Sequence, residues 1–71
     1  MIYEFWDVRT NNILAAYESR EEAEELIRRA VQENGPIALE WVMLLEDDPS
    51  AEDKTFIGVG SELLRFIRDA A

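Results

Sequence analysis

Hydrophobic and polar residues alternate at the start of the chain in the manner of a half-buried β-strand. The segment Ile2–Val8 is built of β-branched and aromatic residues, and Ile13–Tyr17 repeats the pattern with weaker strand formers. Between them, Arg9–Asn12 has the composition of a turn, because asparagine tolerates the left-handed conformation and bonds its own backbone. These segments predict a β-hairpin. Asp7 is unusual in a strand, and we expect it to pair with Arg9 or to serve the turn.

The next segment changes to the period of an amphipathic helix. Ser19 and Glu22 have the spacing of a capping box, and Gly35 and Pro36 are stop signals that place the helix end at Asn34. Apolar residues between these signals recur three and four positions apart along one stripe: Ala23, Leu26, Ile27, Ala30 and Val31.

Alternation returns over Ile37–Glu46, which we interpret as a third strand. We expect one of its faces to fill the core, with Ile37, Leu39, Trp41, Met43 and Leu45. The other face then leaves Val42 and Leu44 on a less buried side. After an acidic loop, Lys54–Val59 predicts a fourth strand, and Ser61 is placed to cap a final helix. The apolar residues of that helix are Leu63, Leu64, Phe66, Ile67 and Ala70.

The predicted order is therefore β-β-α-β-β-α, in one domain over residues 1–71. A four-stranded, mostly antiparallel sheet with both helices packed on one face is the natural α+β arrangement for this order.

Composition narrows the chemistry that such a domain can perform. The 71 residues include no histidine and no cysteine, and 16 acidic residues against seven basic ones give a net charge of −9. The usual catalytic base, nucleophilic thiol and transition-metal ligands are thus missing, so we assign no catalytic residue, no metal and no cofactor. The negative charge disfavours nucleic acids and anionic membranes as partners. No apolar run could span a bilayer and the first residues lack a secretory pattern, so we expect a cytoplasmic protein.

Three patterns resemble sites but favour structural interpretations. Gly58–Ser61 lies between a strand and a helix, but it lacks the lysine of a phosphate loop and precedes Glu62. The acidic loop Glu46–Asp53 offers oxygen ligands without the spacing of a calcium loop. Asp7 and Glu40 are the carboxylates that could form an acid–base pair, yet nothing in their spacing brings them together.

Size and apolar content favour self-association. A short chain that cannot form disulfides and is 48% hydrophobic gains most from a second copy, most simply as a two-fold homodimer. The expected interface is either an edge strand or an apolar patch on the open sheet face, with Trp6, Val8, Val42 and Leu44 at the centre of the patch and Glu4 and Glu40 at its rim.

A non-enzymatic interaction or regulatory module is therefore the leading hypothesis. One alternative is an acidic nucleic-acid mimic, like an antitoxin, that inhibits a basic partner through Glu21, Glu22, Glu25 and the loop Asp47–Asp53. Another is a small-ligand-binding domain or enzyme, which the residue inventory disfavours.

The chain also resembles small uncharacterised bacterial proteins of β-β-α-β-β-α layout. The resemblance rests on Tyr3-Glu4-Phe5-Trp6-Asp7, Asn12, Ser19-x-x-Glu22-Ala23, Gly35 and Gly60-Ser61-Glu62-Leu63. It implies the same compact fold and brings no activity with it.

Overall fold

Four strands form one sheet that is uncovered on one side. The computed structural model describes residues 1–70, with side chains through Ile67. The strands are β1 (Ile2–Asp7), β2 (Asn12–Tyr17), β3 (Val42–Asp47) and β4 (Thr55–Val59). Their order in the sheet is β2-β1-β3-β4, and every neighbouring pair is antiparallel.

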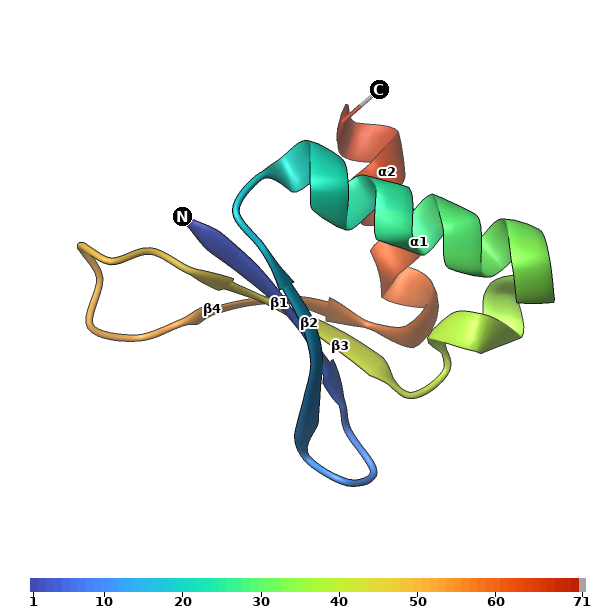
Figure 1. Ribbon diagram of the computed structural model, residues 1–71, viewed down its shortest axis with the longest axis horizontal. Helices are drawn as coiled ribbons and strands as arrows, with labels where there is room; N and C mark the ends of the chain where they lie inside the picture. The colour runs from blue at the N-terminus through green and yellow to red at the C-terminus, as the bar shows by residue number, and fades with distance from the viewer. Residues whose placement is uncertain (71) are drawn as a thin grey trace.

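Two helices cover the other side of this sheet (Figure 1). They are α1 (Arg20–Asn34) and α2 (Leu63–Ala70), and short 3-10 turns precede β3 and α2, namely η1 (Pro36–Leu39) and η2 (Gly60–Glu62). The α+β class and the order β-β-α-β-β-α are confirmed. Within residues 1–70, no helix combines the length and the apolar character that a membrane crossing requires.

The core lies between the sheet and the helices. Its buried hydrophobic residues are Tyr3, Phe5, Ala23, Ile27, Leu39, Leu44, Leu63 and Phe66. The stripe predicted for the first helix is confirmed, since Ala23 and Ile27 are buried and Leu26, Ala30 and Val31 pack beside them. The burial expected for Ala70 lies outside the described side chains.

The ends of α1 follow the local signals. The Ser19 hydroxyl oxygen accepts the Glu22 N–H at 3.2 Å, which satisfies one of the free donors of the first turn. At the other end Gly35 has a φ of 77°, and its N–H donates to the Val31 carbonyl at 2.7 Å. At the second helix the capping bond comes from Glu62 rather than Ser61, because the Glu62 carboxylate accepts the Val59 N–H at 3.0 Å.

The third strand begins later than predicted. Residues Pro36–Leu39 form η1, and β3 starts only at Val42. Gly35 takes a left-handed φ that redirects the chain, and Pro36 then fixes the φ of the first position of a helical turn. Leu39 still reaches the core, but from this turn and not from a strand.

The two faces of β3 are the reverse of the prediction. Leu44 is fully buried and Val42 packs against the same core, whereas Trp41 is 44% exposed. The expectations that Leu44 and Val42 lie on the open side and that Trp41 and Ile37 fill the core are therefore wrong. Met43 and Leu45 take the open side instead. The pattern misled because odd and even positions here are both largely apolar, and because η1 interrupts the alternation.

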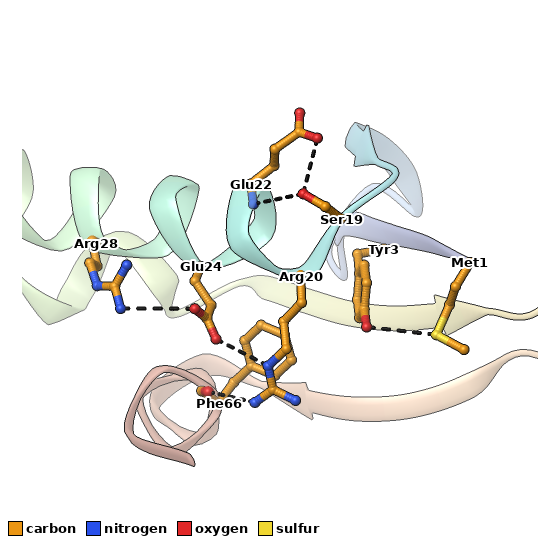
Figure 2. Close-up of polar contacts among 8 residues, drawn as sticks. All are labelled: Met1, Tyr3, Ser19, Arg20, Glu22, Glu24, Arg28 and Phe66. Atoms are coloured by element: carbon orange, nitrogen blue, oxygen red, sulfur yellow. Dashed lines mark hydrogen bonds and ion pairs between the residues drawn. The ribbon is translucent and has the colours of Figure 1, made fainter. Parts of the chain in front are cut away.

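One carboxylate belongs to the buried set. Glu24 accepts a hydrogen bond from Arg20 Nε at 3.0 Å and lies 3.9 Å from Arg28 Nη2. Arg20 also donates to the Phe66 carbonyl at 2.9 Å, with its guanidinium 4.1 Å from the centre of the Phe66 ring. Figure 2 shows Arg20 between α1 and Phe66 of α2, so this arginine joins the two helices.

Candidate functional site: the open face of the sheet

The side of the sheet opposite the helices, which we name the open face, carries apolar residues from all four strands. Trp6 lies opposite Ile13 of β2 and Met43 of β3, and Leu45 of β3 lies opposite Phe56 of β4. Directly paired residues of neighbouring strands point to the same side of a sheet. These five residues therefore share the face that Figure 1 shows without a helix.

Much of this apolar surface is in contact with water. Phe56 is 55% exposed and Ile13 is 49% exposed, although both are large hydrophobic residues. Just past the strand ends, the Val8 N–H donates to the Trp41 carbonyl at 2.9 Å, and both side chains are exposed. A contiguous exposed apolar surface on a small domain indicates an interaction site.

A charged cluster stands within this apolar surface. Glu4 Oε1 accepts hydrogen bonds from Lys54 Nζ at 2.9 Å and from Trp6 Nε1 at 3.1 Å. The Lys54 ammonium also lies 5.6 Å from the centre of the Trp6 ring, which is a cation–π arrangement. Lys54 directly precedes β4. Because β3 lies between β4 and β1, the Lys54 side chain extends across β3 to contact Glu4 on the inner strand β1.

The ion pair shifts the titration of both partners. The hydrogen bond from Lys54 holds the pKa of the Glu4 carboxyl below its ordinary value of 4.5, against the opposing effect of burial. The same bond raises the pKa of the Lys54 ammonium above 10.5. Both groups are therefore charged throughout the neutral range.

We expect replacement of Glu4 by glutamine to lower the melting temperature by about 2–4 °C at pH 7, because the ion pair is lost while the Trp6 acceptor is kept. Since the folded-state pKa of Glu4 is depressed, its contribution is complete above pH 4.5 and is lost as the pH falls through the folded value. Thermal unfolding of Glu4→Gln and wild type from pH 7 to pH 2.5 checks this. A difference between the two proteins that does not shrink as the pH falls below 4.5 contradicts it.

The hairpin end of the sheet carries a second charge pair. Asp7 Oδ1 accepts the Arg9 N–H at 2.8 Å, and Arg9 Nη2 lies 3.4 Å from Asp7 Oδ2. The backbone bond from Arg9 lowers the pKa of the Asp7 carboxyl. The Arg9 guanidinium lies 5.3 Å from the centre of the Trp41 ring. The pairing of Asp7 with Arg9 agrees with the sequence analysis.

The predicted interface residues divide into three groups. Trp6 and Glu4 lie on the open face, with Glu4 on an inner strand rather than at the rim, and Val8 extends the same surface. Val42 and Leu44 belong to the helix side. Glu40 lies in the turn between η1 and β3, where it lines a shallow hollow with Ile37 and Val59.

Sequence reasoning missed Ile13, Met43, Leu45, Phe56 and Lys54 as members of this surface. The first four follow from strand pairing, which the local pattern does not contain. Lys54 meets Glu4 across 50 positions of sequence. The one available signal was that Lys54 is the only lysine in a strongly acidic chain.

Two other candidate sites from the sequence are the Gly58–Ser61 junction, for a phosphate, and the acidic residues, for a metal ion. The Val59 N–H, which a phosphate at the Gly58–Ser61 junction would need, is already bonded to the Glu62 carboxylate. A Cβ on Gly58 would lie 3.1 Å from the Glu62 Cβ, so this glycine allows η2 to pack closely on β4. Among the side chains of residues 1–67, no three acidic groups come together in a way that could hold a metal ion.

The carboxylates proposed for nucleic-acid mimicry do not form an unbroken row. Glu21, Glu22 and Glu25 line one hollow on α1, but Arg29 lines it with them and lies 3.7 Å from the Glu25 carboxylate. A phosphate-like row would carry no cation among its anions.

A cleft of about 190 Å³ lies between α1, η1 and the sheet. All of its lining residues are apolar, and the small residues Ala15, Ala30 and Ala38 are among them. It offers no polar side chain that could orient a ligand.

Comparisons with protein-family models, with curated protein sequences and with solved structures find no match for this chain.

Proposed function

We propose that this chain is a non-enzymatic protein-interaction module that forms a two-fold homodimer by packing two open faces together. The observation that carries the proposal is the exposed apolar surface that all four strands contribute to, with Phe56 and Ile13 as its most exposed members. Burial of such a surface is the main source of stability in protein association.

The sheet edges are poorer candidates for the interface. In the pairing of β2 with β1, Leu14 has no opposite residue, and in the pairing of β4 with β3 the same is true of Ile57. Each is a bulge on an edge strand, and bulges disrupt the regular hydrogen-bonding groups that an added strand needs. Both side chains turn toward the helix side, where Leu14 lines the apolar cleft and Ile57 packs on the core.

Charge also favours the open face as the meeting surface for two acidic copies. On this face the Glu4 carboxylate is paired with Lys54, and at the hairpin end of the sheet the Asp7 carboxylate is paired with Arg9. Exposed carboxylates gather elsewhere, on α1 and in the loop between β3 and β4, which projects away from the sheet in Figure 1. Two copies therefore repel each other least when their open faces meet.

The test is the mass in solution of three proteins across a dilution series. Wild type is expected to have twice the mass of the chain, and Phe56→Asp is expected to be a monomer with an unchanged circular dichroism spectrum. Ile37→Asp is the matched control, since Ile37 is 72% exposed but lies in η1 and not on the open face, and this variant should remain a dimer. The wild-type dimer should resist 1 M salt, because an apolar interface is little affected by screening.

Two results would overturn the proposal. One is a wild-type protein that stays monomeric at millimolar concentration. The other is a Phe56→Asp variant that dimerises as tightly as wild type.

A further inference from the structure

We propose that Glu4 and Lys54 exchange partners across the two-fold axis of this dimer, so that each open face selects a second copy of the same chain by charge. The inference rests on the proposed function, because it requires two open faces in contact. It goes further by assigning the choice of partner to two named residues.

The first support is hydrogen-bonding capacity that the monomer leaves unused. Both bonds to the Glu4 carboxylate reach the same oxygen, Oε1, and within residues 1–67 no donor is found for Oε2. The Lys54 ammonium has three N–H donors and uses one of them on Glu4. When two faces meet and water leaves, these free groups need new partners or cost stability.

The second support is the position of the pair. Glu4 lies on the inner strand β1, opposite Ala16 of β2 and Leu45 of β3. Ala16 is small, and on the outside of the sheet the Lys54 side chain is 42% exposed and that of Glu4 is 12% exposed. A partner that covers the open face also covers this ion pair. Burying charges without matching partners costs binding free energy.

These two properties define the surface that fits. A purely apolar partner would leave the free oxygen of Glu4 and two Lys54 donors without hydrogen bonds. A partner with a single charge would satisfy one residue and repel the other. A second copy related by a two-fold axis offers a lysine to Glu4 and a glutamate to Lys54, in reversed order.

The Asp7–Arg9 pair does not serve the same purpose. It lies at the hairpin end of the sheet, its arginine is strongly exposed, and it is already closed by a backbone and a side-chain bond within one turn. Exposed ion pairs of this kind discriminate weakly between partners.

The first experiment uses single charge reversals. Glu4→Lys and Lys54→Glu are each expected to weaken self-association about tenfold or more, because each face then carries two like charges. An equimolar mixture of the two should form heterodimers in clear excess over homodimers, as read by native mass spectrometry. Glu21→Lys and Arg29→Glu are the matched controls, since they change the net charge equally but lie on α1. Their mixture should give the statistical ratio of species.

The second experiment separates exchange between copies from pairing within one copy. The double variant Glu4→Lys/Lys54→Glu should dimerise with itself like wild type, since both pairs are restored in reversed order. Mixed with ¹⁵N-labelled wild type, it should form few mixed dimers, because each contact between residues 4 and 54 would then join like charges.

The outcomes distinguish this inference from the proposed function. A statistical mixture of wild type and double variant, with dimers that Phe56→Asp still dissociates, overturns the exchange and leaves the interface intact. A wild-type monomer overturns the interface itself.

Discussion

Replacing Leu44 by alanine is expected to lower the free energy of unfolding by about 3 kcal/mol, the usual loss for a leucine in a packed core. Leu44 is fully buried at the centre of β3, next to Phe5 of β1 and under both helices. For a domain of this size such a loss is a large part of the total stability. Urea unfolding followed by Trp fluorescence measures it directly.

Leu45→Ala is the matched control, with the same chemical change one position along the same strand. Because Leu45 lies on the open face, this variant should retain most of the stability of the monomer. Its loss should instead depend on protein concentration, since it removes part of the dimer interface. Equal losses for the two variants at low protein concentration would mean that β3 has no distinct core face.

This pair of leucines also shows why the sequence predicted some elements and not others. The signals for α1 are all local: a serine cap, an apolar stripe and a Gly-Pro stop lie within 18 residues of one another, from Ser19 to Pro36. Each signal acts through neighbouring backbone groups, so no distant partner could override it. The bounds of α1 were accordingly predictable.

The faces of β3 depend on tertiary structure instead. Alternation identifies a buried face only when the two faces differ in polarity, and Val42 through Leu45 are all apolar. The pairing of Leu44 with Phe5 decides the matter, and that pairing joins residues 39 positions apart. The residues that form the open face could not be predicted for the same reason, although the presence of an apolar surface on the sheet could.

The charged residues give a parallel contrast. Asp7 and Arg9 are close in sequence, and their pairing could be anticipated. Arg20 is an unusual residue at its position, because a cation at the first position of a helix interacts unfavourably with the helix dipole. Such a misplaced charge points to a tertiary role, and here the role is to join α1 to α2.

Replacing Arg20 by methionine is therefore expected to cost about 2–3 kcal/mol of stability. Glu24, whose side chain is 7% exposed, would keep Arg28, at 3.9 Å, as its one cationic partner within residues 1–67. The Phe66 carbonyl would lose its bond from Arg20, and the Phe66 ring would lose the guanidinium that covers it. Figure 2 shows these contacts converging on one side chain.

Two further variants identify the cause of that loss. Arg29→Met removes an arginine of the same helix whose ion pair with Glu25 is exposed, and it should leave stability almost unchanged. The double variant Arg20→Met/Glu24→Leu should recover much of the loss, because the cost of the single variant comes largely from an unpaired buried carboxylate. If the double variant is no more stable than Arg20→Met alone, the loss of stability comes from the Phe66 contacts. Hydrogen exchange of the α2 amides should then show that this helix opens separately from the sheet.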